Sequence, residues 1–224
     1  MLLQLKNISK GYGEMGTHSF RPVLSELNLE IGKGEKIAII GPSGSGKTTL
    51  LNLIGALDLP DSGEVIFDGK NITGYSKKEL ATFRNQHLGF IFQLHHLMPQ
   101  LNLWENVLLP LLPQGNTISK EQKEWAEYLI KKVGIWEQRN QKPSEMSGGE
   151  CQRTAVVRAL INRPELILAD EPTGALDEEN ANALSELLIQ LSDDENVTLV
   201  TVTHSTELAE QMDKKYILRK GNLE

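Results

Sequence analysis

Eight consecutive residues at positions 41–48, Gly-Pro-Ser-Gly-Ser-Gly-Lys-Thr, have the pattern of a phosphate-binding loop. The apolar run at 36–40 before them predicts a buried strand, and the run at 49–54 after them predicts a helix. Glycine lets the backbone curl around phosphates with its N–H groups pointing inward, and the start of the helix adds the positive end of its dipole. This context predicts a nucleoside triphosphate site in an α/β chain and favours it over a plain Gly/Ser-rich turn.

The end of this loop carries the side chains for phosphate and metal. We expect Lys47 to place its charge on the outer phosphates and Thr48 to offer its hydroxyl to Mg²⁺. The residues expected to bind the nucleotide here are Gly41, Pro42, Ser43, Gly44, Ser45, Gly46, Lys47, Thr48 and Thr49.

Composition narrows the class of protein. The 224 residues are 39% hydrophobic and 24% charged, which is ordinary for a globular α/β chain. The net charge of −7 argues against a nucleic-acid partner, because phosphate backbones require clustered Lys and Arg. The single cysteine, Cys151, cannot form an internal disulfide, which fits a reducing compartment. No apolar run approaches the ~20 residues that span a bilayer, so we expect any membrane role to come through a partner.

Hydrophobic patterns predict the layers around the loop. Alternation at 27–31 and a hairpin pattern after the first helix indicate an antiparallel β layer. Continuous apolar or β-branched runs at 166–170 and 197–203 are typical of strands buried in a parallel sheet, with a helix at 178–192 between them. Residues 94–145 look mostly helical. The predicted fold class is therefore α/β: a P-loop core with a mostly parallel sheet, an antiparallel β layer and a helical lobe.

Two further sites are suggested by local chemistry. Asp170 and Glu171 end a buried strand, where one carboxylate can hold Mg²⁺ and the other can polarise an attacking water; a solvated acidic loop is the alternative. The residues Ser147-Gly148-Gly149 precede a helix-like stretch and form either a second anion site or a plain helix cap.

Three residues are ambiguous on their own. Gln93 is a polar strand end, His204 follows the last buried strand, and Tyr12 lies in a Gly-flanked turn. His204 could contact a γ-phosphate and Tyr12 could stack on a base, but each could equally be structural.

In their order and spacing, these residues resemble the motifs of the ATP-binding cassette (ABC) ATPases along essentially the whole chain. The loop at 41–48 is similar to the Walker A motif, Gln93 is similar to the Q-loop glutamine, and residues 146–150 are similar to the ABC signature. Residues 166–170 with Glu171 are similar to the Walker B motif and its catalytic glutamate, and residues 175–177 are similar to the D-loop. His204 corresponds to the switch histidine, and Tyr12 corresponds to the aromatic residue that stacks on adenine.

This resemblance implies one nucleotide-binding domain, with a RecA-like core and β layer at about 1–93 and 155–224 and a helical lobe with the signature at about 94–154. It implies ATP and Mg²⁺ as ligands. The implied catalytic residues are Glu171, His204 and Gln93. The implied metal ligands are Thr48, Gln93 and Asp170. The residues implied to contact ATP bound to a second copy are Ser147, Gly148 and Gly149.

The same resemblance implies partners. Two copies would form a head-to-tail dimer around two ATP molecules, and residues 94–110 would receive a coupling helix from an integral-membrane permease subunit at the cytoplasmic face of the membrane. The stretches 88–99 and 169–174 are similar to a branch of lipoprotein-releasing, macrolide-export and antimicrobial-peptide-detoxification ATPases. Residues 95–99 favour the lipoprotein branch, whereas Ala175 looks more like the peptide branch.

There are departures and alternatives. Met146, Glu150 and Gly174 replace the usual Leu, Gln and Ser. We expect an ATPase subunit that drives lipoprotein release or the export of a hydrophobic drug or peptide. The alternative is a regulatory or mechanotransmission subunit that controls a cell-wall enzyme or sensor without net transport. An ABC ATPase acting on nucleic acid or ribosomes is disfavoured by the single cassette and the acidic charge.

Overall fold

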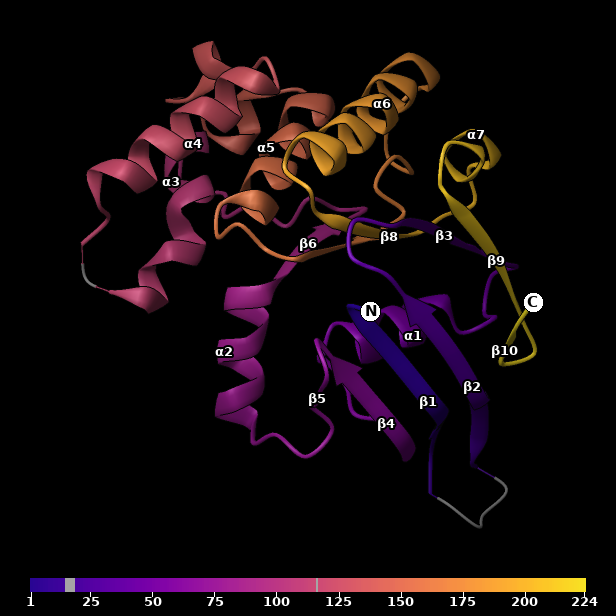
Figure 1. Cartoon of the computed structure of the whole chain (residues 1–224). Coiled ribbons are helices and arrows are strands. Elements are labelled where there is room, and N and C mark those ends of the chain that lie inside the picture. Colours follow the sequence, from indigo (N-terminus) through magenta and orange to yellow (C-terminus); the bar gives the residue numbers. More distant parts are fainter. Residues whose placement is uncertain (15–18, 116) are drawn as a thin grey trace. The chain divides into compact units, whose positions relative to one another are not determined.

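The computed structural model describes residues 1–14, 19–115 and 117–224 (Figure 1). They form two compact units. The first unit comprises Met1–Arg84 and Thr198–Glu224, and the second comprises Asn85–Val197. The predicted lobe at 94–154 falls within the second unit. Its description as part of a single domain stays a prediction.

An antiparallel sheet forms one layer of the first unit. Its strands are β1 (Leu3–Tyr12), β2 (Arg21–Ile31), β4 (Ser62–Phe67) and β5 (Lys70–Asn71), in the order β2-β1-β4-β5. Alternate residues of β2 are buried at its end, as the pattern at 27–31 predicts, because successive side chains of a strand point to opposite faces. The predicted antiparallel layer is confirmed.

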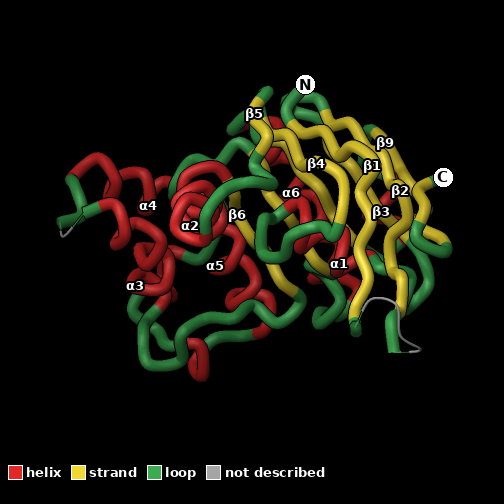
Figure 2. Tube along the Cα trace, turned by 90° about the horizontal axis from the view of Figure 1, so that it is seen from below, coloured by secondary structure: helices red, strands yellow, loops and turns green. Residues whose placement is uncertain are grey.

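Parallel strands carry the phosphate loop in the same unit. The strand β3 (Lys36–Ile40) pairs in parallel with both β8 (Thr198–Val202) and β9 (Lys214–Arg219), and β10 (Asn222–Leu223) is antiparallel to β9. The helix α1 (Lys47–Ile54) follows β3 and lies beside the strands of this unit (Figures 1 and 2). A short helix, α7 (Thr206–Glu210), follows β8. The sequence patterns did not indicate α7, β9 or β10.

The second unit combines two parallel strands with helices. The strands β6 (Leu88–Phe92) and β7 (Leu166–Asp170) pair in parallel. Its helices are α3 (Leu103–Leu108), α4 (Lys120–Lys132), α5 (Gly148–Leu160) and α6 (Glu178–Asp194), with 3₁₀ turns η1 (Leu109–Gln114), η2 (Trp136–Gln138) and η3 (Pro143–Glu145). The helix α2 (Lys77–His87) contains the boundary between the units.

Helix α5 approaches strand β6 so closely that only glycine fits between them. A Cβ atom at Gly89 would lie 2.4 Å from the carbonyl oxygen of Ala159. At the end of the same strand, the Gln152 amide donates a 2.9 Å hydrogen bond to the carbonyl oxygen of Phe92. The close packing therefore fixes α5 against the strand that leads into Gln93.

The segment at 94–145 is mostly helical, as predicted, but its first residues, 94–102, form bends, turns and irregular chain. The side chain of Asn106, which has no exposed surface, explains the difference. Its amide accepts from the N–H of Met98 at 2.7 Å and donates to the carbonyl oxygens of Met98, Leu101 and Asn102 at 2.9–3.1 Å. These bonds satisfy backbone groups that a helix would otherwise pair.

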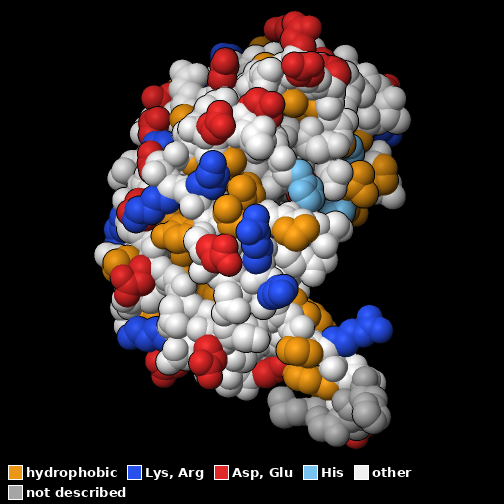
Figure 3. Space-filling view, turned by 90° about the vertical axis from the view of Figure 1, so that its right-hand side faces the viewer, with side chains coloured by type: hydrophobic (Ala, Val, Ile, Leu, Met, Phe, Trp, Pro, Cys, Tyr) orange, Lys and Arg blue, Asp and Glu red, His pale blue; other side chains and the backbone are white. Residues whose placement is uncertain are grey.

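Among the described residues, no helix is both long enough and apolar enough to cross a membrane. On the face shown in Figure 3, acidic and basic side chains are both present. The absence of a nucleic-acid partner stays a prediction.

Candidate nucleotide-binding site

The phosphate loop is a tight turn between the end of β3 and the start of α1. Gly44 and Gly46 have φ angles of 76° and 103°, which side-chain-bearing residues rarely adopt. A Cβ atom at Gly41 would lie 2.5 Å from the carbonyl oxygen of Leu218, so this position also requires glycine. The backbone of the loop is therefore shaped by its glycines, as the sequence predicts.

Two polar side chains of the loop fit a phosphate ligand. Lys47 is 7% exposed, and its ammonium donates hydrogen bonds of 2.8 and 3.2 Å to the carbonyl oxygens of Gly41 and Pro42. The hydroxyl of Ser45 is buried and has no hydrogen-bond partner among the described residues. The Lys47 ammonium has three donors, and the Ser45 hydroxyl has one, so both side chains can donate hydrogen bonds to phosphate oxygens. A bound phosphate would also give the buried Ser45 hydroxyl a partner, and a buried hydroxyl without one is energetically costly.

The first unit also places His204 at the edge where this loop lies. Strands β3 and β8 are parallel, with Ile39 opposite Val202, and the N–H of Thr203 donates to the carbonyl oxygen of Ile39 at 3.2 Å. Their carboxyl ends therefore meet at one edge of the sheet, where His204 is exposed.

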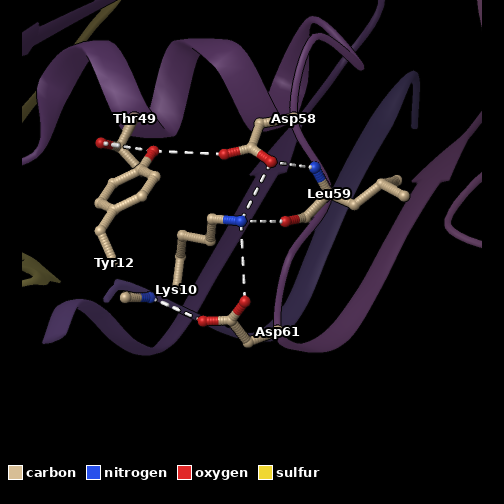
Figure 4. A network of polar contacts seen from close by, with 7 residues as sticks. Lys10, Tyr12, Thr49, Asp58, Leu59 and Asp61 are labelled. Atoms are coloured by element: carbon tan, nitrogen blue, oxygen red, sulfur yellow. Dashed lines mark hydrogen bonds and ion pairs between the residues drawn. The ribbon is translucent and has the colours of Figure 1, made fainter. Parts of the chain in front are cut away.

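Tyr12 lies at the end of β1 and near the start of α1. Its hydroxyl is 3.5 Å from Thr49 Oγ1 and donates a 3.2 Å hydrogen bond to Asp58 (Figure 4). The side chain is 46% exposed, which leaves surface for a ligand. The first unit thus holds Tyr12, the loop 41–49 and His204.

The second unit brings Gln93, Asp170 and Glu171 to the carboxyl ends of two parallel strands. The register pairs Phe92 with Asp170, so Gln93 and Glu171 each follow directly after a paired residue. A Cβ atom at Gly174 would lie 3.0 Å from the Gln93 amide nitrogen, which shows that Gln93 lies against the 171–174 turn. Glycine at 174, a departure from the usual serine, permits this approach.

The backbone of Glu171 is unusual for a residue with a side chain. Its φ angle is 46°, and its carbonyl oxygen accepts a 3.0 Å hydrogen bond from the N–H of Gly174. Strained backbone of this kind tends to occur at functional sites, because the surrounding structure must hold it in place. The turn therefore fixes the backbone of the predicted catalytic glutamate.

The donors in the two units suit Mg²⁺, which prefers oxygen ligands. Thr48 supplies a hydroxyl in the first unit, whereas Gln93 and Asp170 supply amide and carboxylate oxygens in the second. Within the part of the chain that the structure describes, no three His, Cys, Asp or Glu side chains form a metal-binding group.

The signature residues begin helix α5. Ser147 is the N-cap: its hydroxyl accepts from the N–H of Glu150 at 3.2 Å and donates to the Glu150 carboxylate at 2.9 Å. The N–H of Ser147 also donates to that carboxylate, and this bond holds the pKa of Glu150 below its ordinary value. Ser147 and Gly148 are exposed, so the N-terminus of the helix is open to a ligand from outside the unit.

Sequence reasoning missed several side chains that support these residues. The guanidinium of Arg158 donates two 2.7 Å hydrogen bonds to the carbonyl oxygens of His95 and His96, just after Gln93. In the first unit, Lys10 and Asp58 contact Tyr12, and Asp61 pairs with Lys10. Their partners lie far away in the sequence, so no local pattern could have found them.

The environment of Cys151 is structural rather than reactive. Its side chain is buried, and burial together with the charge of Glu150 raises the pKa of the thiol. A thiol in this environment is poorly reactive.

Comparison with known proteins agrees with these motifs. The sequence profile of the family described as "ABC transporter" matches residues 24–174. The chain is 48% identical over 224 residues to the lipoprotein-releasing system ATP-binding protein LolD of Francisella tularensis subsp. holarctica, covering 100% of this chain and 96% of that protein. It is 46% identical over 222 residues to LolD 1 of Rhodopirellula baltica, covering 99% of this chain and 96% of that protein.

A solved structure also resembles the chain over its full length. The dimeric, post-hydrolysis state of the ATP-binding cassette MJ0796 bound to ADP and Pi has a TM-score of 0.89 and 38% sequence identity, covering 100% of this chain and 97% of that one. The predicted fold class and the predicted ATPase activity are confirmed. The loop at 41–48 thus belongs to an ATP-hydrolysing cassette, and this chain is a member of the ABC transporter family.

Proposed function

We propose that this chain is the ATP-hydrolysing subunit of a membrane complex that releases lipoproteins. The observation that carries the proposal is the 48% identity, over the whole chain, to a lipoprotein-releasing ATP-binding protein. The sequence motif at 95–99 supports the same branch. Ala175, which resembles the peptide branch, is the single residue that points elsewhere.

Residues of one subunit would bind and cleave the nucleotide. Lys47 and the N–H groups of the loop hold the outer phosphates, and Ser45 donates its hydroxyl to one of them. Thr48, Gln93 and Asp170 are the residues that would hold Mg²⁺, and the ion would supply positive charge near the phosphates. Glu171 takes the proton of the attacking water, and His204 binds the γ-phosphate.

A second copy would complete each site. Ser147 and Gly149 lie at the exposed N-terminus of α5, whose backbone N–H groups and dipole favour an anion. Glu150 already caps this helix with a carboxylate, so a γ-phosphate approaching Ser147 would have to compete with it. We therefore expect a head-to-tail dimer in which each signature binds ATP held by the other copy, as the dimeric state of the solved relative suggests.

The membrane partner would dock on residues 94–110. Two large apolar side chains are exposed there: Leu94 is 67% exposed and Met98 is 48% exposed. Asn106 fixes the backbone around Met98, so the surface is preformed rather than loose. Through this contact the chain would lie at the cytoplasmic face of the membrane.

The test is a tagged Glu171→Gln variant purified with Mg-ATP from detergent-solubilised membranes. Loss of a positioned base typically lowers the rate by about 10²–10⁴-fold, so this variant should retain ATP and its partners. We expect a membrane subunit with an external domain, and a lipoprotein bound to it, to co-purify.

The matched control is Glu186→Gln, which changes an exposed residue of α6 in the same unit. It should hydrolyse ATP at the normal rate. Recovery of soluble proteins or ribosomes alone would contradict the membrane-complex proposal. A membrane subunit bound to a cell-wall enzyme instead of a lipoprotein would favour the mechanotransmission alternative.

A further inference from the structure

The side chains of Lys10, Asp58 and Asp61 form a connected polar network with the exposed Tyr12 in the first unit (Figure 4). One oxygen of the Asp58 carboxylate accepts from the Tyr12 hydroxyl at 3.2 Å, and the other accepts from the Lys10 ammonium at 3.0 Å. Lys10 also lies 3.6 Å from Asp61 and donates to the carbonyl oxygen of Leu59 at 2.8 Å. We call Lys10, Asp58 and Asp61 the tyrosine anchor.

Partial burial and ion pairing favour a fixed geometry of the tyrosine anchor. The Lys10 side chain is only 11% exposed, and those of Asp58 and Asp61 are 33% and 29% exposed. Burial by itself raises the pKa of Asp58, but hydrogen bonds from Lys10 and from the Leu59 N–H bring that pKa below its ordinary value. The partly buried ion pairs are therefore formed at neutral pH and are less screened than surface pairs.

The position of Lys10 also affects the ring electronically. Its ammonium lies 5.4 Å from the centre of the Tyr12 ring, within the range of a cation–π interaction. A cation near one face draws electron density from the ring, which favours stacking of an electron-rich heterocycle on the exposed part. The hydroxyl, held by Asp58, keeps the ring from turning away from α1.

We propose that Lys10, Asp58 and Asp61 are positioning residues that hold Tyr12 as a preformed platform for the purine base of the nucleotide. This inference rests on the proposed function, because it assigns Tyr12 to the nucleotide site. The anchor strengthens the contacts to the base of the nucleotide and has no effect on the contacts to its phosphates. Immobilising the platform beforehand removes an entropic cost of binding.

A purely structural role for the anchor makes a different prediction. The N–H of Gly11 donates to Asp61 at 2.7 Å, and the N–H of Asp61 donates to the carbonyl oxygen of Ser9 at 2.9 Å, so the network also ties β1 to the 58–61 turn. If this tie were its only role, substitutions would lower stability and weaken all ligands alike. A ligand without a base separates the two roles.

The experiment compares Mg-ATP and Mg-tripolyphosphate binding by calorimetry for the full chain and for the variants Asp58→Asn, Tyr12→Phe and Tyr12→Ala. Asp58→Asn and Tyr12→Phe should weaken ATP binding by about 3- to 10-fold, because stacking of the base on one aromatic ring contributes at least about that factor to the affinity. Tripolyphosphate binding should stay within about twofold. Tyr12→Ala should lose the most ATP affinity, and adding Asp58→Asn to it should cost nothing further.

The matched control is Asp68→Asn, which breaks the exposed 2.9 Å pair with Lys33 in the same unit and should change neither affinity. Equal losses for both ligands in Asp58→Asn, or additive losses in the double variant, would overturn the positioning role. A wild-type chain that binds neither ligand would refute the proposed function itself, which is a separate outcome.

Discussion

Individual residues of the phosphate loop are constrained by backbone shape before any ligand arrives. Gly44 and Gly46 both have positive φ angles, but their surroundings differ: a Cβ atom at Gly44 would meet nothing within 4 Å, whereas one at Gly46 would lie 2.8 Å from Val23 Cγ1. A substitution at Gly44 therefore meets backbone strain alone, whereas one at Gly46 meets both backbone strain and steric overlap.

We predict that Gly44→Ala lowers the free energy of unfolding by about 1–2 kcal/mol, because alanine resists a left-handed conformation. Gly46→Ala should cost at least about 1 kcal/mol more, because overlap with Val23 adds to the strain. Urea unfolding without nucleotide measures both. The control is Gly74→Ala, where φ is not positive and nothing lies within 4 Å. Equal losses at positions 44 and 46 would contradict this account.

The tyrosine anchor should make stability depend on pH in two windows. The folded-state pKa of Asp58 lies below 3.8, so its contribution is present above about pH 4 and is lost as the pH falls through the folded-state value. The pKa of Lys10 is affected first by burial, which lowers it, but pairing with Asp58 and Asp61 raises it above 10.5. Its contribution is therefore present below pH 10.5 and is lost as the pH rises through the folded-state value.

Urea unfolding of the wild type and of Asp58→Asn tests the acidic window. The stability difference between them should be constant from about pH 5 to 8 and should shrink as the pH falls below about 4, because protonated Asp58 resembles asparagine. A difference that grows towards acidic pH would have the wrong sign.

The elements were predictable to different degrees. The strand–loop–helix unit at 36–54 is found where its pattern indicates it, because a buried strand, glycines and a helix leave few alternatives. The same holds for α5 and α6, which have cap residues and helical spacing. Residues 94–102 are the non-helical start of the segment predicted to be mostly helical, because the side chain of Asn106 competes for their backbone bonds and no helix period reveals that.

We predict that Asn106→Ala destabilises the second unit by about 2–3 kcal/mol, because several buried backbone groups lose their partner. Hydrogen exchange should accelerate most at the Met98 N–H, which donates a hydrogen bond to the side-chain oxygen of Asn106. Asn182→Ala, an exposed change on α6, is the control and should be neutral. Unchanged exchange at Met98 would show that Asn106 does not hold this loop.

At the scale of the whole molecule, the candidate site residues fall into two sets. The first unit holds the phosphate loop, Tyr12 and His204, and the second holds Gln93, the signature and the Asp170-Glu171 pair. The sequence motifs predict both sets, because their chemistry is local. The sequence motifs could not predict the anchor around Tyr12, because Lys10 and Asp58 are 48 residues apart. The motifs also do not identify the cargo, which we expect to contact the membrane partner.

The central claim is that ATP joins two copies through the loop of one and the signature of the other. The most direct measurement is the mass of the Glu171→Gln chain by light scattering, without nucleotide and with saturating Mg-ATP. We predict a monomer without ATP and twice that mass with it. Ser147→Arg, added to the same variant, should bind ATP and stay monomeric. A Glu171→Gln chain that binds ATP but remains a monomer, or a Ser147→Arg chain that dimerises equally well, would contradict the claim.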